Sequence, residues 1–286
     1  MANLKEIRNR IASVSSTKQI TSAMKMVSAA KLRKSQTAIM QLRPYASQME
    51  SMVYRLTDGE KEDIPYIKSK KEEKKILIIA LTSNKGLCSV FNSSIIKLTK
   101  NLIEKYQSEG KVVYLQSFGK KGDAVFKHIK EIDYLGSKDE IWEGLSFEKV
   151  ALLVANILKQ YEKGLYDKVQ IVYNKFKNAA LQEPVVESFL PFDINKQNKT
   201  NSNYIFEPNK VEILQSVVPL FLNTKMYRCF LDSFTSEHGA RMSSMNKATD
   251  NAQTLLNDLT LTYNKLRQAS ITNEIIEICS GANALS

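Results

Sequence analysis

ARMSSMNKATDNAQTLLNDLTLTYNKLRQASITNEIIEICS, residues 240–280, contains neither glycine nor proline. Good helix formers dominate this stretch, so we predict one continuous helix. At ~1.5 Å per residue the helix would be about 60 Å long. This length exceeds the diameter of a small domain. A helix of this length with an apolar face needs a partner helix along its whole length.

An apolar repeat identifies the face that would pack. Positions in alternating steps of three and four are Met242, Met245, Thr249, Ala252, Leu256, Leu259, Tyr263 and Leu266. All but the threonine are apolar, and a sustained repeat of this kind keeps one seam turned toward a partner helix. The sequence therefore predicts a coiled coil.

The opposite end of the chain supplies a partner. Residues 1–43 also lack glycine and proline, and the same spacing relates Leu4, Ile7, Ile11 and Val14. The apolar residues that follow are Ile20, Met24 and Val27, from which we infer that the repeat slips in phase. We expect the two terminal helices to pair antiparallel.

The middle of the chain has a different composition. We divide the chain into an N-terminal shaft helix (1–57), a charged linker (58–74), an α/β globular domain (75–206) and a C-terminal shaft helix (207–286). The run ILIIAL at residues 76–81 suits a strand buried on both faces, as in a parallel sheet. Strands that alternate with helices predict a doubly wound, Rossmann-like α/β domain.

Within that domain the pattern predicts two further strands, 112–117 and 169–173, and three helices. Asn92 or Ser93 would cap a helix that runs to residue 108, a short helix would cover 121–130, and Ser146 would cap 147–162. The Asn-rich stretch 195–203 is expected to be a loop.

Composition excludes several protein classes. The 286 residues include three cysteines without a close pair and two distant histidines, which argues against a disulfide framework, a zinc site or histidine-based catalysis. The longest apolar run, residues 76–81, is far shorter than the ~20 residues that span a bilayer. We predict no catalytic, cofactor-binding or metal-binding residues.

One loop could be taken for a phosphate site. Thr82 to Asn92 follows a strand and precedes a helix, but it holds a single glycine, Gly86, where phosphate loops need several. We interpret this loop as a structural turn, and we give the same interpretation to the segment 119–122. Cys88 is interpreted as structural, and the pair Glu274 and Glu277 as a solvated face.

Charge is concentrated at the N-terminus. Residues 1–43 hold nine Lys/Arg and one acid, a net charge of +8 out of +11 for the chain. Such a helix could neutralise phosphates, lie on anionic lipid, face an acidic protein, or simply stay soluble. The first aromatic residue is Tyr45, which weakens single-stranded nucleic acid as a partner. Because residues 1–43 contain few acidic residues, this segment also has the composition of a cleavable transit peptide.

Both ends resemble the gamma subunit of F-type ATP synthases of the bacterial type. The segment 4–36, LKEIRNRIASVSSTKQITSAMKMVSAAKLRKSQ, is similar to that family's opening, and 271–284, ITNEIIEICSGANA, is similar to its C-terminal signature. Further similar motifs are 240–242, 247–252, 263–270, 83–88 and Glu207-Pro208. Because the likeness begins almost at Met1, we expect the basic segment to be mature shaft.

Two departures from the family pattern stand out. Ser89-Val90 replaces a glycine pair, and His238-Gly239 interrupts a run of small residues. A glycine inside a helix costs about 1 kcal/mol relative to alanine, so a local bend at Gly239 is an expectation.

The resemblance implies a non-catalytic rotor. Members form the central stalk within a ring of alpha and beta subunits, beside epsilon and the membrane c-ring, on the cytoplasmic face of the bacterial plasma membrane. It implies partner contacts at Met24, Lys25, Arg241, Gln268, Thr272 and Glu274. The function implied is coupling of proton-driven or sodium-driven rotation to ATP synthesis and hydrolysis, with a basic helical nucleic-acid-binding adaptor as the alternative. ATP and magnesium belong to the neighbouring subunits.

Overall fold

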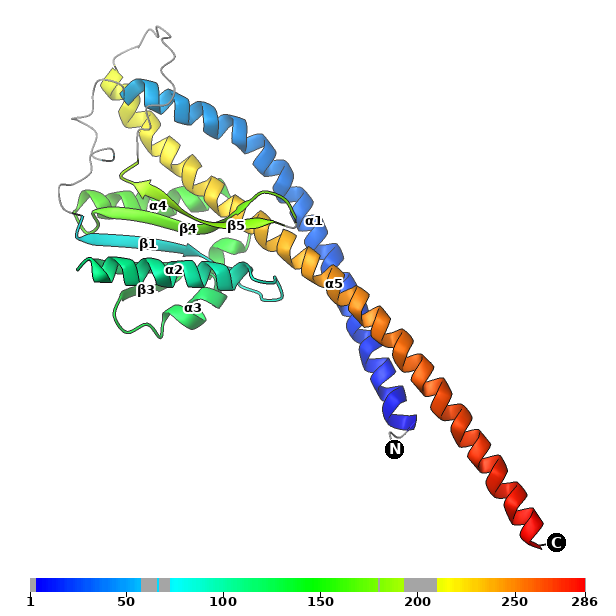
Figure 1. Cartoon of the computed structure of the whole chain (residues 1–286). Coiled ribbons are helices and arrows are strands. Elements are labelled where there is room, and N and C mark those ends of the chain that lie inside the picture. The colour runs from blue at the N-terminus through cyan, green and yellow to red at the C-terminus, as the bar shows by residue number, and fades with distance from the viewer. Residues whose placement is uncertain (1–3, 58–65, 67–72, 180, 193–209, 286) are drawn as a thin grey trace. The chain divides into compact units, whose positions relative to one another are not determined.

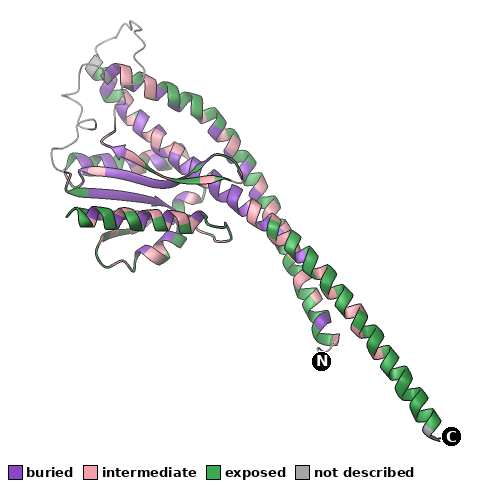
Figure 2. Cartoon of the chain, viewed as in Figure 1, coloured by how far each residue is buried: buried purple, intermediate pink, exposed green. Residues whose placement is uncertain are grey.

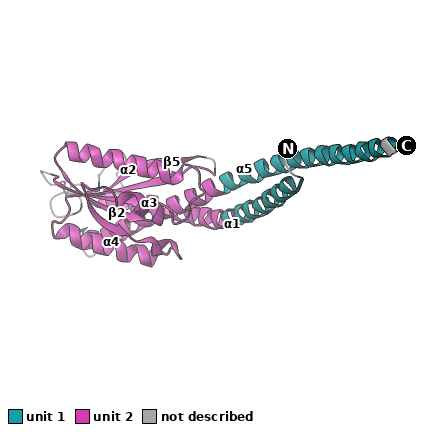
Figure 3. Cartoon of the chain, turned by 90° about the horizontal axis from the view of Figure 1, so that it is seen from below, with its two compact units in different colours: residues 1–28, 242–286 teal, residues 29–241 magenta. Residues whose placement is uncertain are grey.

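The computed structural model describes residues 4–57, 66, 73–179, 181–192 and 210–285. The predicted loop 195–203, the Glu207-Pro208 motif and most of the predicted linker 58–74 lie outside these residues. The described chain divides into two compact units, residues 1–28 with 242–286 (unit 1) and residues 29–241 (unit 2), coloured separately in Figure 3. Two long helices, α1 (Leu4–Thr57) and α5 (Lys210–Leu285), contribute to both units.

Unit 2 is built on a five-stranded sheet with the order β3-β2-β1-β4-β5 (Figure 1). The strands are β1 (Lys75–Leu81), β2 (Val112–Phe118), β3 (Asp133–Ser137), β4 (Lys168–Phe176) and β5 (Gln182–Leu190). β1 pairs in parallel with both β2 and β4, and β5 runs antiparallel to β4. The predicted α/β architecture is confirmed.

Helices cover both faces of the sheet. α2 (Phe91–Ser108) and α3 (Lys120–Phe126) bury one face around Ile78 and Ile95. α4 (Phe147–Glu162) and parts of α1 and α5 bury the other around Ile79 and Phe230. Strand β1 is therefore buried on both sides, as its continuous apolar run predicts (Figure 2).

Several local predictions are corrected. Ser146 caps α4 as expected and accepts a hydrogen bond from the Lys149 amide, but neither Asn92 nor Ser93 caps α2, whose N-cap position is Val90. Asn92 is occupied elsewhere, because its side-chain oxygen accepts from the Ser83 amide. Strands β3 and β5 were not predicted, and a 3-10 helix (Asp139–Trp142) joins β3 to α4.

Unit 1 contains the ends of the two long helices. The Thr249 hydroxyl donates to the Thr21 hydroxyl at 2.9 Å, and the Lys18 ammonium donates to the Gln253 side chain. The partner residue number rises as the α1 number falls, so the two segments are antiparallel, as predicted.

The predicted phase slip on α1 is wrong. Ile20 and Val27 are 61% and 57% exposed, whereas Thr21 and Ser28 are buried. The residues that continue the steps of three and four without interruption are Leu4, Ile7, Ile11, Val14, Lys18, Thr21, Lys25 and Ser28, and all are buried or half-buried. Two of the polar side chains in this seam, Lys18 and Thr21, have hydrogen-bond partners on α5.

The predicted seam on α5 is confirmed, and its last buried or half-buried position is Leu266. Every position from Met242 to Leu266 of the predicted repeat is buried or half-buried, whereas residues 271–283 are exposed on all sides (Figure 2). Among the described residues, no helix combines the length and the apolar character needed to cross a bilayer.

Candidate functional site

The carboxyl edge of the sheet is where an α/β domain would bind a ligand. In open sheets of this kind the crevice lies at the point where the strand order reverses, which here is between β1 and β4. The loop that follows β1, residues 82–90, borders this place, and Asn174 of β4 lies across from it. The residues that fill the place decide what the domain can do.

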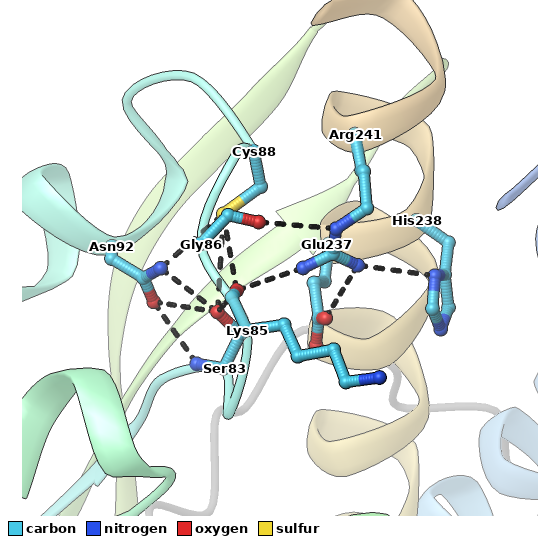
Figure 4. A network of polar contacts seen from close by, with 8 residues as sticks. All are labelled: Ser83, Lys85, Gly86, Cys88, Asn92, Glu237, His238 and Arg241. Carbon is cyan, nitrogen blue, oxygen red and sulfur yellow. Dashed lines mark hydrogen bonds and ion pairs between the residues drawn. The ribbon is translucent and has the colours of Figure 1, made fainter. Parts of the chain in front are cut away.

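Helix α5 fills it. The Ser236 hydroxyl donates to the Asn174 carbonyl at 3.0 Å, and the Asn174 amide group donates to the Phe91 carbonyl. One turn further along, the Arg241 guanidinium reaches the loop after β1 (Figure 4). A segment of the chain itself therefore occupies the position at which related folds hold nucleotides.

Arg241 uses each part of its guanidinium. Nε donates to the Gly86 carbonyl at 3.2 Å, Nη2 donates to the Lys85 carbonyl at 2.8 Å, and Nη1 lies 2.7 Å from a Glu237 carboxylate oxygen. The Arg241 and Glu237 side chains are 7% and 10% exposed. The loop thus presents carbonyl acceptors to a cation, whereas a phosphate loop presents N–H donors to an anion.

Burial shapes the protonation of this cluster. Desolvation raises the pKa of Glu237, and the adjacent Arg241 opposes that shift. Desolvation, with Arg241 and Lys31 adding to it, lowers the pKa of His238 to about 3, so the imidazole is neutral near pH 7. His238 Nδ1 lies 3.4 Å from Arg241 Nη1, and its Nε2 is buried with no hydrogen-bond partner.

The loop itself is tied together at its base. The Asn92 side-chain amide donates to the Ser83 hydroxyl at 2.8 Å and lies 3.3 Å from the Cys88 sulfur. Burial raises the pKa of the Cys88 thiol, although the charge of Arg241 opposes the shift. A buried thiol held in its protonated form is a poor nucleophile. This environment agrees with the structural interpretation of Cys88.

Glycines 119 and 122 serve packing. A Cβ at Gly119 would lie 2.3 Å from the Thr82 carbonyl oxygen, and a Cβ at Gly122 would lie 2.6 Å from the Thr82 hydroxyl. Gly119 also has φ 115°, a backbone conformation that favours glycine. The start of α3 therefore sits directly on the end of β1, as a structural turn would.

The residues expected to contact partners lie in different environments. Met24 and Lys25 are half-buried, and Gln268, Thr272 and Glu274 are exposed. Arg241 is 6% exposed and bonded within unit 2, so the structure does not bring its guanidinium to a surface as expected. Among the described residues, no three His, Cys, Asp or Glu side chains gather as a metal site would require.

Sequence reasoning missed the Arg241 cluster. Glu237 and Arg241 stand four apart on a helix, a spacing that favours an ion pair, so half of the cluster could have been found. The burial of this ion pair and its contact with the two loop carbonyls could not have been predicted, because they depend on the tertiary structure. The expected bend at Gly239 is not observed as a break, since α5 is one helix there. A Cβ at Gly239 would lie 3.4 Å from the Ala179 Cα, an ordinary van der Waals distance, so alanine would also fit against the turn between β4 and β5.

Comparisons with known proteins place the whole chain in one family. A family model described as ATP synthase matches residues 3–285. The chain is 50% identical to an ATP synthase gamma chain of Flavobacterium johnsoniae and 42% identical to one of Cytophaga hutchinsonii, and each match covers all of both chains.

Solved structures agree on the fold. A chain of the Euglena gracilis mitochondrial ATP synthase, in a structure described as OSCP, F1 and c-ring, matches with a TM-score of 0.66 at 19% identity, covering 99% of this chain and 94% of that one. A chain of the Tetrahymena thermophila enzyme, described as central stalk and c-ring, matches with a TM-score of 0.59 at 24% identity, covering 80% and 99%. The chain therefore belongs to the family of ATP synthase gamma chains, the non-catalytic subunits that form the central-stalk rotor.

Proposed function

We propose that this rotor couples ion-driven rotation of a membrane c-ring to ATP synthesis and hydrolysis in a surrounding ring of alpha and beta subunits, with epsilon bound beside it. The complex would place the chain at the cytoplasmic face of the bacterial plasma membrane, as a peripheral component. We also retain the division into shaft helices (1–57 and 207–286), linker (58–74) and globular domain (75–206) as a proposal.

One observation supports the ring most directly. Residues 271–283 form a helix exposed on every side, although they include four isoleucines, Ile271, Ile275, Ile276 and Ile278, that are 48–71% exposed. No described part of the chain covers this helix end, and an isolated helix gains little stability from local interactions alone. Large exposed apolar surfaces mark interaction sites, so a sleeve of partner subunits is the natural environment for this helix end.

The proposed mechanism is differential contact. A single asymmetric rod cannot meet three equivalent catalytic sites in the same way, so each rotor angle gives the sites different conformational free energies. To move one site from 1:99 to 99:1 between two states requires about 5.5 kcal/mol of differential contact energy. The rod needs no catalytic group of its own to supply it.

Five residues are proposed to make these contacts. Met24 and Lys25 lie on the basic N-terminal segment, where Lys25 would meet an acidic partner loop. Gln268, Thr272 and Glu274 lie on the exposed end of α5. Arg241, buried inside unit 2, is proposed to act indirectly, through the loop that it holds.

Purification and pumping assays test the proposal. The tagged chain should co-purify with alpha and beta subunits, and the complex should pump protons or sodium ions in vesicles on addition of ATP. Reversing the charge at Lys25 (Lys25→Glu), or replacing Met24 (Met24→Lys), should lower the number of ions pumped per ATP hydrolysed more than it lowers ATP turnover. An unchanged ratio in both variants would remove these residues from the coupling contact.

A further inference from the structure

The loop Ser83–Asn92 carries backbone strain at its tip. Leu87 and Ser89 have φ values of 61° and 53°, in the left-handed region that costs non-glycine residues roughly 1–2 kcal/mol each. The tip gains little from burial in return, because Leu87 and Val90 are 64% and 67% exposed. Contacts elsewhere must therefore hold this shape.

Two sets of contacts do so. The base of the loop is closed by Asn92, Ser83 and Cys88, as described above. The side that leads into the tip is held by the Arg241 bonds to the carbonyls of Lys85 and Gly86 (Figure 4). These bonds come from another element, α5, so the loop conformation depends on a contact that is distant in sequence.

The contact depends on a balanced buried charge. Glu237 neutralises Arg241 at 2.7 Å, and removing one partner of a buried pair leaves the other without compensation. The planar guanidinium serves Glu237 and two carbonyls at once, which a single lysine ammonium cannot reproduce in that geometry. Glu237 orients Arg241, and Arg241 orients the loop.

We propose that Glu237 and Arg241 are positioning residues that latch the Ser83–Asn92 loop in the strained conformation, and that the latched loop is required for rotary coupling. This inference rests on the proposed function for its second half only. A functional contact surface must be held to within about 0.5 Å by its supporting residues, and the exposed, strained tip has the form of such a surface. Loss of the latch would let the loop tip move and would weaken its contact with a partner subunit, although no side chain on the tip is changed.

The three cysteines report the state of the loop in the isolated chain. Cys88 belongs to the loop and is 2% exposed, Cys229 is fully buried in the core of unit 2, and Cys279 is exposed. N-ethylmaleimide should modify Cys279 first in every variant. Labelling of Cys88 without Cys229 reports opening of the loop, and labelling of both reports unfolding of unit 2.

The variants are Glu237→Gln, which removes one charge at constant size, and Arg241→Lys, which keeps the charge and loses the fork. The matched control is Glu187→Gln, which removes the charge that pairs with Arg228 at 2.6 Å and Lys225 at 3.7 Å on α5. Because Cys229 also contacts Glu187, only the Cys88 rate is compared in this control. We expect Cys88 to be labelled at least tenfold faster in both latch variants, with Cys229 protected, and within twofold of the parent rate in the control. Equal Cys88 rates in the parent and in Glu237→Gln would overturn the latch.

Pumping by the reconstituted ATP synthase complex tests whether the latched loop is required for coupling. Ions pumped per ATP hydrolysed should fall at least twofold with Glu237→Gln and remain unchanged with Glu187→Gln. A loop that opens with no loss of coupling would overturn the requirement for the latch. Failure of the parent chain to assemble or to support pumping would contradict the proposed function instead, and the labelling result would stand independently.

Discussion

Helix α5 is a single helix, but one part of it is buried and the other is exposed to solvent. From Leu214 to Arg241 it is packed against a sheet and other helices, and most of its residues are buried, including polar ones such as Asp232 and Ser233. From Ile271 to Asn283 nothing in the described chain covers it. The first region contributes to the stability of unit 2, and we propose that the second contacts partner subunits. Substitutions should therefore separate stability from function along one helix.

The largest expected effect is in the buried region. Phe230 is fully buried and makes an edge-to-face contact with Phe118 at 5.0 Å between ring centroids. Phe230→Ala should lower the free energy of unfolding by about 3–5 kcal/mol through lost burial and a cavity. Ile278→Ala, at a position 71% exposed, should change it by less than about 0.5 kcal/mol. Urea titration followed by circular dichroism measures both, and similar losses would erase the distinction between the two regions.

Acid should affect the buried region next most strongly. His238 has a folded-state pKa of about 3 against an ordinary value near 6.5, so the unfolded chain takes up the proton first. The stability that His238 contributes is fully present above pH 6.5 and is lost as the pH falls toward 3. Between pH 7 and pH 5 the expected loss is about 2 kcal/mol.

A variant isolates that contribution. Burial raises the pKa values of Glu237 and Asp232, so their protonation stabilises the folded chain as the pH falls and opposes the His238 effect. The measurement is therefore the difference in unfolding free energy between the parent and His238→Gln at pH 7 and pH 5. His128→Gln, at an exposed position, is the control. A difference that is constant with pH would mean that the pKa of His238 is the same in the folded and the unfolded chain.

The helix pair of unit 1 explains what the sequence could and could not predict. On α5 every seam position except Thr249 is apolar, so the spacing alone identified the buried face. On α1 the same seam passes through Lys18, Thr21 and Ser28. The partners of Lys18 and Thr21, Gln253 and Thr249, are supplied only by the paired structure. A prediction based on apolar residues alone therefore placed Ile20 in the seam, although Ile20 lies on the solvent-exposed face.

The sheet repeats that lesson. β1 was predicted from six consecutive apolar residues, whereas β5 was not predicted, and its sequence holds Pro184 and the charged Glu183 and Glu187, which are unfavourable in a central strand. The structure places β5 at the sheet edge, where proline is tolerated. In the same way the spacing of Glu237 and Arg241 favours an ion pair on one helix, but it does not indicate the two loop carbonyls that Arg241 binds.

A smaller effect is expected at the seam of unit 1. Leu259 is half-buried, so Leu259→Ala should cost about 1–2 kcal/mol, below the usual 2–5 kcal/mol for a fully buried leucine, and should lower the thermal midpoint of the isolated chain. Gln268→Leu, on the exposed surface, should leave that midpoint nearly unchanged and reduce the ATPase activity or assembly of the reconstituted complex. The reverse pattern would show that the seam and contact faces of α5 are exchanged.

The smallest expected effect is a gain. Ser89 has a φ of 53°, and a left-handed backbone costs a residue with a Cβ roughly 1 kcal/mol or more. Ser89→Gly should therefore raise the free energy of unfolding by about 1 kcal/mol, less the greater chain entropy that glycine brings to the unfolded state. Ser93→Gly, four residues along in helix α2, should instead destabilise by roughly 0.5–1 kcal/mol. Opposite signs in the two thermal midpoints would locate the strain at the loop tip; a loss in both would mean that Ser89 is unstrained in solution and that the loop needs less support from Arg241 than its backbone angles indicate.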